Sequence, residues 1–429
     1  MHAKATVLPG QDPFYSYRGT TPLADIAPGA VLKTRILSYH VTGLVVPVRV
    51  VQLLYRSTGA IGQPAVNVTS VLRPRALSGT PAVVSYQSFY DSLNPADEPS
   101  YAIAGGLTLG GIIANLESAV IVPALLAGEV VVVPDIEGGE ADFGAGPEYG
   151  MNTLDSLRAA LGSPATGLAN VAKIGLIGYS GGAIATEWAA ELAPTYAPDV
   201  NERLVGAAMG GVLVDPAHNL RYVDGSRLWA GMIPMALVGI ARAYHVDLAP
   251  YLSAYGLQLC RKLQRASIVR VLGAYPGLTW AQLASPQYKT LESVPAYVEI
   301  ANQLIMGSRG TPTVPLFIGQ GANGELEGTR GNKPGIGAGD GVMITGDVRS
   351  LAREYCARGV PVEYVQYDSL SHITSAVPCL ARAAAWLFAR LNGSPLPRHR
   401  GHIAPGNSLA PIDRPGSGRL DRPGRLDTK

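Results

Sequence analysis

The chain has 429 residues, of which 47% are hydrophobic and only 15% are charged, and its formal net charge is +2. This composition predicts a large buried core, and the small net charge gives no reason to expect nucleic acid or an acidic membrane as a partner. The longest apolar region, residues 102–134, is interrupted by Glu117, Glu129 and several glycines, so no membrane-spanning segment is expected. The first ten residues show no basic and apolar regions typical of a signal peptide.

The three cysteines, Cys260, Cys356 and Cys379, allow at most one disulfide within the chain, and their sequence positions leave open whether any two are paired. No CxxC spacing occurs, so we expect no structural metal site. We also expect no cofactor. The sequence does not indicate an oligomeric state.

Short apolar segments alternate with helical patterns along most of the chain. Residues 31–75 favour β-structure, and helical patterns cover 348–356 and 381–391. Further apolar segments, several ending in polar residues, are 83–86, 130–135, 173–177, 205–209, 315–319 and 362–367. Such segments are typical of buried parallel strands with functional loops at their carboxyl ends. The sequence therefore predicts an α/β-hydrolase fold, with a mostly parallel sheet flanked by helices.

One apolar, helix-rich region interrupts this alternation and predicts an inserted helical cap. We divide the chain into an N-terminal extension (1–30), a first core part (31–214), a cap (215–297), a second core part (298–393) and a tail (394–429). The tail is rich in Pro, Gly, Arg and Asp, and we expect it to be disordered.

The pentapeptide Gly178-Tyr179-Ser180-Gly181-Gly182 has the pattern G-x-S-x-G. An apolar segment, 173–177, precedes it and a helical pattern, 183–192, follows it. Strand, tight turn and helix together are typical of the nucleophile elbow, in which small residues at Gly178, Gly181 and Gly182 let the backbone turn sharply below the serine. The helix directs its N-terminal amides toward an anion that forms there. Ser180 is therefore the predicted nucleophile.

A serine nucleophile requires a histidine base that follows it in the chain. Only His372 comes after a late predicted strand and shortly before a final helix. The other histidines lie before the serine, in the predicted cap or in the tail: His2, His40, His218, His245, His399 and His402.

The sequence offers two candidates for the carboxylate partner. A Gly-rich loop follows the segment 315–319 and offers Glu325 early and Asp340 late, just before a helix. We favour Asp340 and keep Glu325 as the alternative, because triad acids usually lie in this loop. Asp347 is better explained as a helix N-terminal residue.

The oxyanion hole requires two amide donors. One is expected from Gly181, directly after the nucleophile, and the other from the loop 86–91 after an early strand. Asp91 in that loop could contribute its amide or its side chain, or could simply be a turn residue.

Motifs in a fixed order give the chain a family resemblance. They are Asp12–Tyr15, Leu54–Thr58, Ser85–Gln87 with Tyr90–Asp91, Asp135–Gly138, Gly178–Ala183, Tyr196–Pro198, Glu354–Gly359 and His372. Over about residues 12–391 the chain resembles the secretory lipase family of yeasts and actinobacteria, typified by yeast lipase A. The resemblance implies an exported α/β hydrolase with a helical cap, which cleaves triacylglycerols and other carboxylic esters without a cofactor. It places the triad at Ser180, Asp340 and His372, and the oxyanion hole at Asp91 and Gly181.

We therefore expect a serine carboxylester hydrolase acting on lipid esters or other small ester substrates, and a lipid ester substrate is compatible with work at a lipid–water interface. The alternatives are an acyltransferase that uses the same triad and a non-catalytic binding protein on a hydrolase fold. The apolar cap residues Trp229, Met232, Met235, Leu237 and Ile240 either line an acyl site or form the packing face of the cap. If they line an acyl site, specificity should rise from two-carbon to at least about six-carbon acyl esters.

Overall fold

The computed structural model describes residues 7–74, 82–396 and 402–413, and a nine-stranded mixed sheet runs through it. The strand order is β1-β2-β3-β5-β4-β6-β7-β8-β9. The strands are β1 (Val31–Val41), β2 (Leu44–Thr58), β3 (Pro64–Arg73), β4 (Val83–Gln87), β5 (Val130–Pro134), β6 (Ile174–Tyr179), β7 (Leu204–Gly210), β8 (Leu316–Gly321) and β9 (Val362–Tyr367).

Strand direction divides the sheet into two parts. β1, β2 and β3 pair antiparallel, and β3 is also antiparallel to β5. All pairs from β5 to β9 are parallel. The strand order reverses at β4, which lies between β5 and β6, and the carboxyl ends of strands at such a switch point form a crevice where ligands bind. The predicted α/β-hydrolase fold is confirmed.

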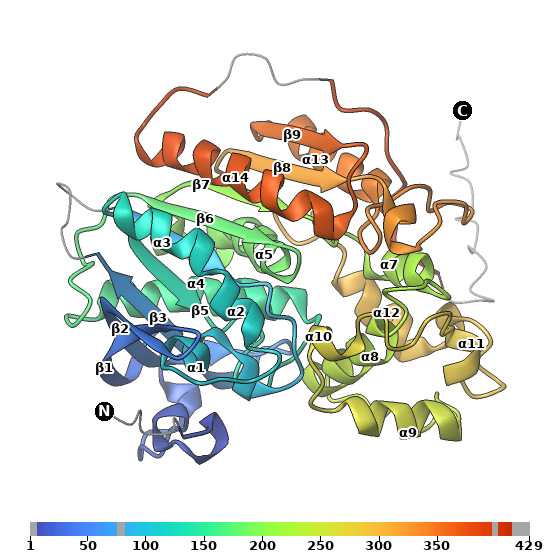
Figure 1. Cartoon of the computed structure of the whole chain (residues 1–429), viewed down its shortest axis with the longest axis horizontal. Helices are drawn as coiled ribbons and strands as arrows, with labels where there is room; N and C mark the ends of the chain where they lie inside the picture. Colours follow the sequence, from blue (N-terminus) through green and yellow to red (C-terminus); the bar gives the residue numbers. More distant parts are fainter. Residues whose placement is uncertain (1–6, 75–81, 397–401, 414–429) are drawn as a thin grey trace, which may run out of the picture.

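Helices cover both faces of the sheet, and each face buries its own apolar core (Figure 1). On one face the core includes side chains of α4, α5 and α13, and on the other it includes side chains of α3 and α14. The helices outside the insertion are α1 (Pro99–Ile103), α2 (Ile112–Leu116), α3 (Ser118–Leu126), α4 (Gly146–Gly162), α5 (Gly181–Tyr196), α6 (Pro198–Asn201), α13 (Thr345–Ala357) and α14 (His372–Leu391). No helix among the described residues is both long and apolar enough to cross a membrane.

The cap is a helical unit inserted between β7 and β8, and its apolar core also includes Leu93, Phe143 and residues of the loop 336–344. It lies beside the end of the sheet in Figure 1. Its helices are α7 (Pro216–Val223), α8 (Met232–Ala243), α9 (Ala254–Leu263), α10 (Ile268–Val271), α11 (Trp280–Leu283) and α12 (Pro295–Gln303). Because α12 continues across the expected boundary at 297/298, the helical insertion extends to Gln303.

Short 3-10 helices complete the fold. They are η1 (Pro9–Gln11), η2 (Pro13–Tyr15), η3 (Leu23–Asp25), η4 (Pro95–Asp97), η5 (Leu291–Ser293) and η6 (Gly324–Glu327). The first three lie in the N-terminal extension, where Asp12 forms an ion pair with Arg35 of β1 at 2.6 Å. This contact attaches the extension to the antiparallel edge of the sheet.

The tail differs from the expected disorder where the structure describes it. Asn407 donates hydrogen bonds to the Ile336 carbonyl and to Asp347, and the backbone of Ile412 pairs with the Asn302 side chain. Residues 402–413 therefore pack against both the core and α12, because polar side chains satisfy the backbone groups of a segment rich in proline and glycine. Residues 397–401 and 414–429 of the predicted tail, and 1–6 of the extension, lie outside the described residues.

Candidate functional site

Ser180 lies in a sharp turn between β6 and α5, with φ 53° and ψ −121°. This conformation is strained for a residue with a side chain, and only close packing around it maintains it. A Cβ atom on Gly178 would lie 2.2 Å from the Gly182 carbonyl oxygen, and one on Gly182 would lie 2.0 Å from the Gln87 carbonyl oxygen. Both glycines are therefore required for the tight turn that exposes the Ser180 hydroxyl at the end of the sheet.

The side chains of Ser180, His372 and Asp340 form a continuous hydrogen-bonded chain. His372 Nε2 lies 2.8 Å from Ser180 Oγ, and His372 Nδ1 lies 2.8 Å from Asp340 Oδ2. Since a carboxylate only accepts hydrogen bonds, Nδ1 carries the proton and Nε2 is left to accept one from the serine. His372 is the first residue of α14, which begins earlier than the helical pattern suggested.

Asp340 is fully buried, and backbone and side-chain donors fix its carboxylate. The amides of Val342 and Met343 donate to Oδ1, and Gln320 Nε2 donates to Oδ2 at 2.9 Å. The structure thus places Asp340, and not the exposed Glu325, at the histidine. Asp347 lies in the first turn of α13 and contacts His218 instead.

The pKa of His372 is raised above its ordinary value. Burial alone would lower it, but the charge of Asp340 and the hydrogen bond to it outweigh burial, with smaller contributions from Glu327 and Asp91. This environment stabilises the imidazolium that forms when the histidine accepts a proton.

Asp91 and Gly181 lie against each other beside the serine. A Cβ atom on Gly181 would lie 1.8 Å from Asp91 Oδ1, and that oxygen has no hydrogen-bond partner among the described residues. Gly181 is the first residue of α5, so its amide has no acceptor within the helix. Burial raises the pKa of Asp91 to about 7, although the charge of His372 opposes the shift.

Two further residues complete the surroundings of His372: Trp229, expected from the sequence only as an apolar cap residue, and Glu327, which the sequence analysis did not identify. Trp229 of the cap packs edge-on against the imidazole, with ring centroids 5.3 Å apart. Its indole N–H donates to Glu327 Oε2 at 2.6 Å. Glu327 lies two residues beyond Glu325 in the same loop, and no spacing rule distinguishes the buried glutamate from the exposed one.

The remaining titratable groups give no sign of a metal centre. Among residues 7–74, 82–396 and 402–413, no cluster of three or more histidine, cysteine, aspartate or glutamate side chains is arranged to hold a metal ion. All three cysteines are unpaired, with Cys260 and Cys379 buried and Cys356 exposed.

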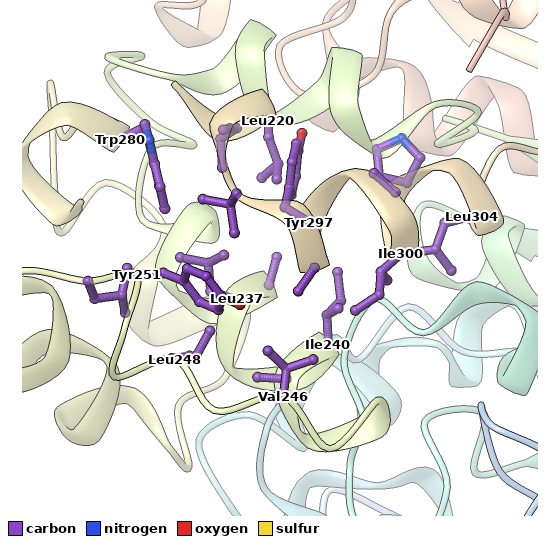
Figure 2. Close-up of a pocket in the computed structure, with 18 residues that line it drawn as sticks. Leu220, Leu237, Ile240, Val246, Leu248, Tyr251, Trp280, Tyr297, Ile300 and Leu304 are labelled. Carbon is purple, nitrogen blue, oxygen red and sulfur yellow. The ribbon is translucent and has the colours of Figure 1, made fainter. Parts of the chain in front are cut away.

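An apolar pocket lies in the cap, partly open to solvent, with a cavity volume of about 60 Å³. Leu237 and Ile240 of α8 point into it, opposite Tyr297 and Ile300 of α12 (Figure 2). Trp229 and Met235, by contrast, are buried in the core of the cap. Leu237 and Ile240 thus line this pocket, and binding of an acyl chain there stays a prediction.

Comparisons with known proteins agree on the family. The sequence model of the family described as secretory lipase matches residues 104–334. Lipase 6 of Candida albicans is 31% identical over 405 residues, covering 90% of this chain and 82% of the relative. The crystal structure of Candida antarctica lipase A superposes with a TM-score of 0.81 at 26% identity, covering 94% of this chain and 91% of that chain.

A further relative, a probable inactive lipase of Mycobacterium tuberculosis, is 32% identical over 422 residues, covering 96% of this chain and 89% of the relative. Similarity to these proteins therefore supports an ester-hydrolase fold and ancestry, and activity must be judged from this chain's own site. From the matching family model and these full-length relatives, the chain belongs to the secretory lipase family.

Proposed function

We propose that this protein is a serine carboxylester hydrolase that cleaves lipid esters, such as acylglycerols, through an acyl-enzyme on Ser180. The single observation that carries the proposal is the hydrogen-bonded chain Ser180–His372–Asp340, with both contacts at 2.8 Å. A serine, a tautomer-fixed histidine and a buried carboxylate in this order form the machinery of nucleophilic acyl transfer.

In the proposed reaction Ser180 Oγ attacks the acyl carbonyl while His372 Nε2 takes its proton. Asp340 keeps the imidazolium oriented and stabilises its charge. The amides of Gly181 and Asp91 bind the oxyanion of the tetrahedral intermediate. The imidazolium then donates its proton to the departing alcohol oxygen, and a water molecule, deprotonated by His372, releases the acid and regenerates Ser180.

We assign the acyl chain of the substrate to the apolar pocket of the cap, whose lining is almost entirely aliphatic and aromatic and contains no residue of the triad. Each buried methylene contributes about 0.8 kcal/mol to binding, so a lined acyl site favours longer chains over acetate. The family's description as secretory supports export of the protein, and a lipid ester substrate supports action at a lipid–water interface.

The test is the turnover of p-nitrophenyl hexanoate by the wild type and by S180A. We expect S180A to lose at least about a thousandfold in kcat, because the oxyanion hole alone gives only residual catalysis. An S180A variant with most of its activity would reject Ser180 as the nucleophile. Measuring acid and ester products in the presence of an added alcohol separates hydrolysis from acyl transfer, since ester as the main product would indicate an acyltransferase.

A further inference from the structure

Glu327 is a buried glutamate that joins three parts of the molecule. It is 8% exposed, and both of its oxygens accept hydrogen bonds. Oε2 accepts from the indole of Trp229 in the cap, and Oε1 accepts from the amide of Ile373 at 2.8 Å. Glu327 itself belongs to η6 in the second part of the core. One carboxylate thus links the cap, the core and the start of α14.

The packing around this carboxylate leaves little freedom to move. Gly341, which follows Asp340, has φ 131°, and a Cβ atom there would lie 2.4 Å from Glu327 Oε2 and 3.0 Å from Trp229 Nε1. The Asp340 loop therefore closes directly over the hydrogen bond between Trp229 and Glu327. Trp229 is 5% exposed, and its ring stands at 88° to the imidazole of His372.

The position of His372 explains why a carboxylate is useful there. His372 is the first residue of the 20-residue helix α14, and the N-terminal end of a helix carries partial positive charge. An imidazolium that forms at this end is opposed by the helix. Glu327 binds one of the unpaired amides of the first turn and places a negative charge beside the ring.

Resting on the proposed function, we propose that Glu327 and Trp229 are positioning residues for His372. Trp229 holds one side of the imidazole in place, and Glu327 fixes Trp229 and stabilises the imidazolium by its charge. Because Trp229 belongs to the insertion, the histidine is fully supported only while the cap is seated on the core.

The pH dependence of His372 depends on every charged group that faces it. Asp340 hydrogen-bonds its Nδ1 atom, and the charges of Glu327 and Asp91 also raise its pKa. The Tyr179 ring lies 5.2 Å from the imidazole, centroid to centroid. Removing the Glu327 charge destabilises the imidazolium, so the pKa of His372 must fall in a Glu327→Gln variant.

The first experiment compares E327Q with E325Q, which makes the same chemical change two residues away on an exposed side chain. We expect E327Q to lower kcat about tenfold, with KM nearly unchanged, because a charge-assisted contact to the base assembly is lost. The acidic limb of kcat/KM should move to lower pH in E327Q and stay in place in E325Q.

The second experiment uses W229F, which removes the indole N–H and keeps an aromatic ring and the Glu327 charge. We expect a lower kcat without the shift of the acidic limb, since the carboxylate remains beside the imidazole. If E327Q does not fold, W229F still tests the positioning of His372. Circular dichroism and thermal unfolding show whether each variant folds.

A third measurement is independent of turnover. The Hε1 proton resonance of His372, assigned by its absence in H372N, should titrate at lower pH in E327Q than in the wild type. A folded E327Q with wild-type kcat, pH profile and His372 titration would overturn the inference. If the wild type does not hydrolyse esters but E327Q still lowers the His372 pKa, the proposed function fails and the charge effect of Glu327 stands.

Discussion

At the scale of single residues, the site depends on glycines, which lack a side chain, as much as on its reactive side chains. Ser180 has a positive φ, and the turn can form only because Gly178 and Gly182 allow two backbone segments to approach closely. The strain at Ser180 costs about 1–3 kcal/mol, and the surrounding packing offsets it. The reactive hydroxyl is thereby held where His372 Nε2 can reach it.

Gly178→Ala tests this dependence directly. The added methyl group would lie 2.2 Å from the Gly182 carbonyl oxygen, so we expect a loss of about 1–3 kcal/mol in the free energy of unfolding and a large loss of ester turnover. Gly162→Ala is the matched control, because nothing lies within 4 Å of a Cβ atom at the end of α4. Urea unfolding of both variants gives the comparison, and equal stabilities would contradict a steric role for Gly178.

At the scale of secondary-structure elements, the sequence was sufficient for the sheet and the elbow but not for the contacts between loops. Apolar segments that alternate with helical patterns predicted the parallel strands. A parallel strand is buried on both faces of the sheet, so its residues form a short continuous hydrophobic run that is easily recognised. The choice between Asp340 and Glu325 required the path of the loop 322–344, which contains many glycines and has no regular periodicity.

The same reasoning explains why the sequence predicted neither the contacts of Glu327 nor the ordered packing of the tail. Glu327 acts through Trp229, almost a hundred residues away in the chain, and no local pattern records such a contact. The segment 402–413 has the composition of a disordered tail, yet Asn407 and Asn302 pair with backbone groups across the core and cap. Composition measures how much apolar surface a segment can bury and does not measure such specific polar contacts.

The cap pocket gives a prediction at the element scale. Leu237→Trp places a larger side chain in the space between α8 and α12, so we expect turnover of ten-carbon esters to fall several-fold relative to four-carbon esters. Leu257→Trp on α9 makes the same change outside this pocket and should leave the ratio unchanged. A profile over p-nitrophenyl ester chain lengths measures it, and an unaltered ratio in L237W would show that acyl chains bind elsewhere.

At the scale of the whole molecule, buried carboxyl groups on many elements share one property. Burial raises their pKa in the folded protein, to about 7 for Asp91, Glu117 and Asp142 and to about 6 for Asp135 and Asp155. In the unfolded chain such groups ionise near pH 4. Between these values the folded protein binds more protons than the unfolded chain.

We therefore expect the free energy of unfolding to fall as pH rises from about 4 to about 7. In this range the folded protein binds more protons than the unfolded chain, so a rise in pH favours the unfolded chain. The raised pKa values of His372 and His218 act in the same direction, because their stabilising protonation is lost as pH rises through the folded pKa. The lowered pKa of Asp199, which is paired with Arg158, acts in the opposite direction. Thermal unfolding at pH 5 and pH 8 measures this dependence, and a higher unfolding midpoint at pH 8 would show that the buried carboxyl groups do not dominate it.

Covalent labelling tests directly whether Ser180 is an activated nucleophile, without any assumption about the substrate. The folded wild type, S180A and H372A are incubated with a fluorophosphonate, and the modified peptide is identified by mass spectrometry. We expect one label on Ser180 in the wild type, none in S180A and a much slower reaction in H372A. No label on Ser180 in the folded wild type, or equal labelling rates in the wild type and H372A, would show that Ser180 is not activated by His372.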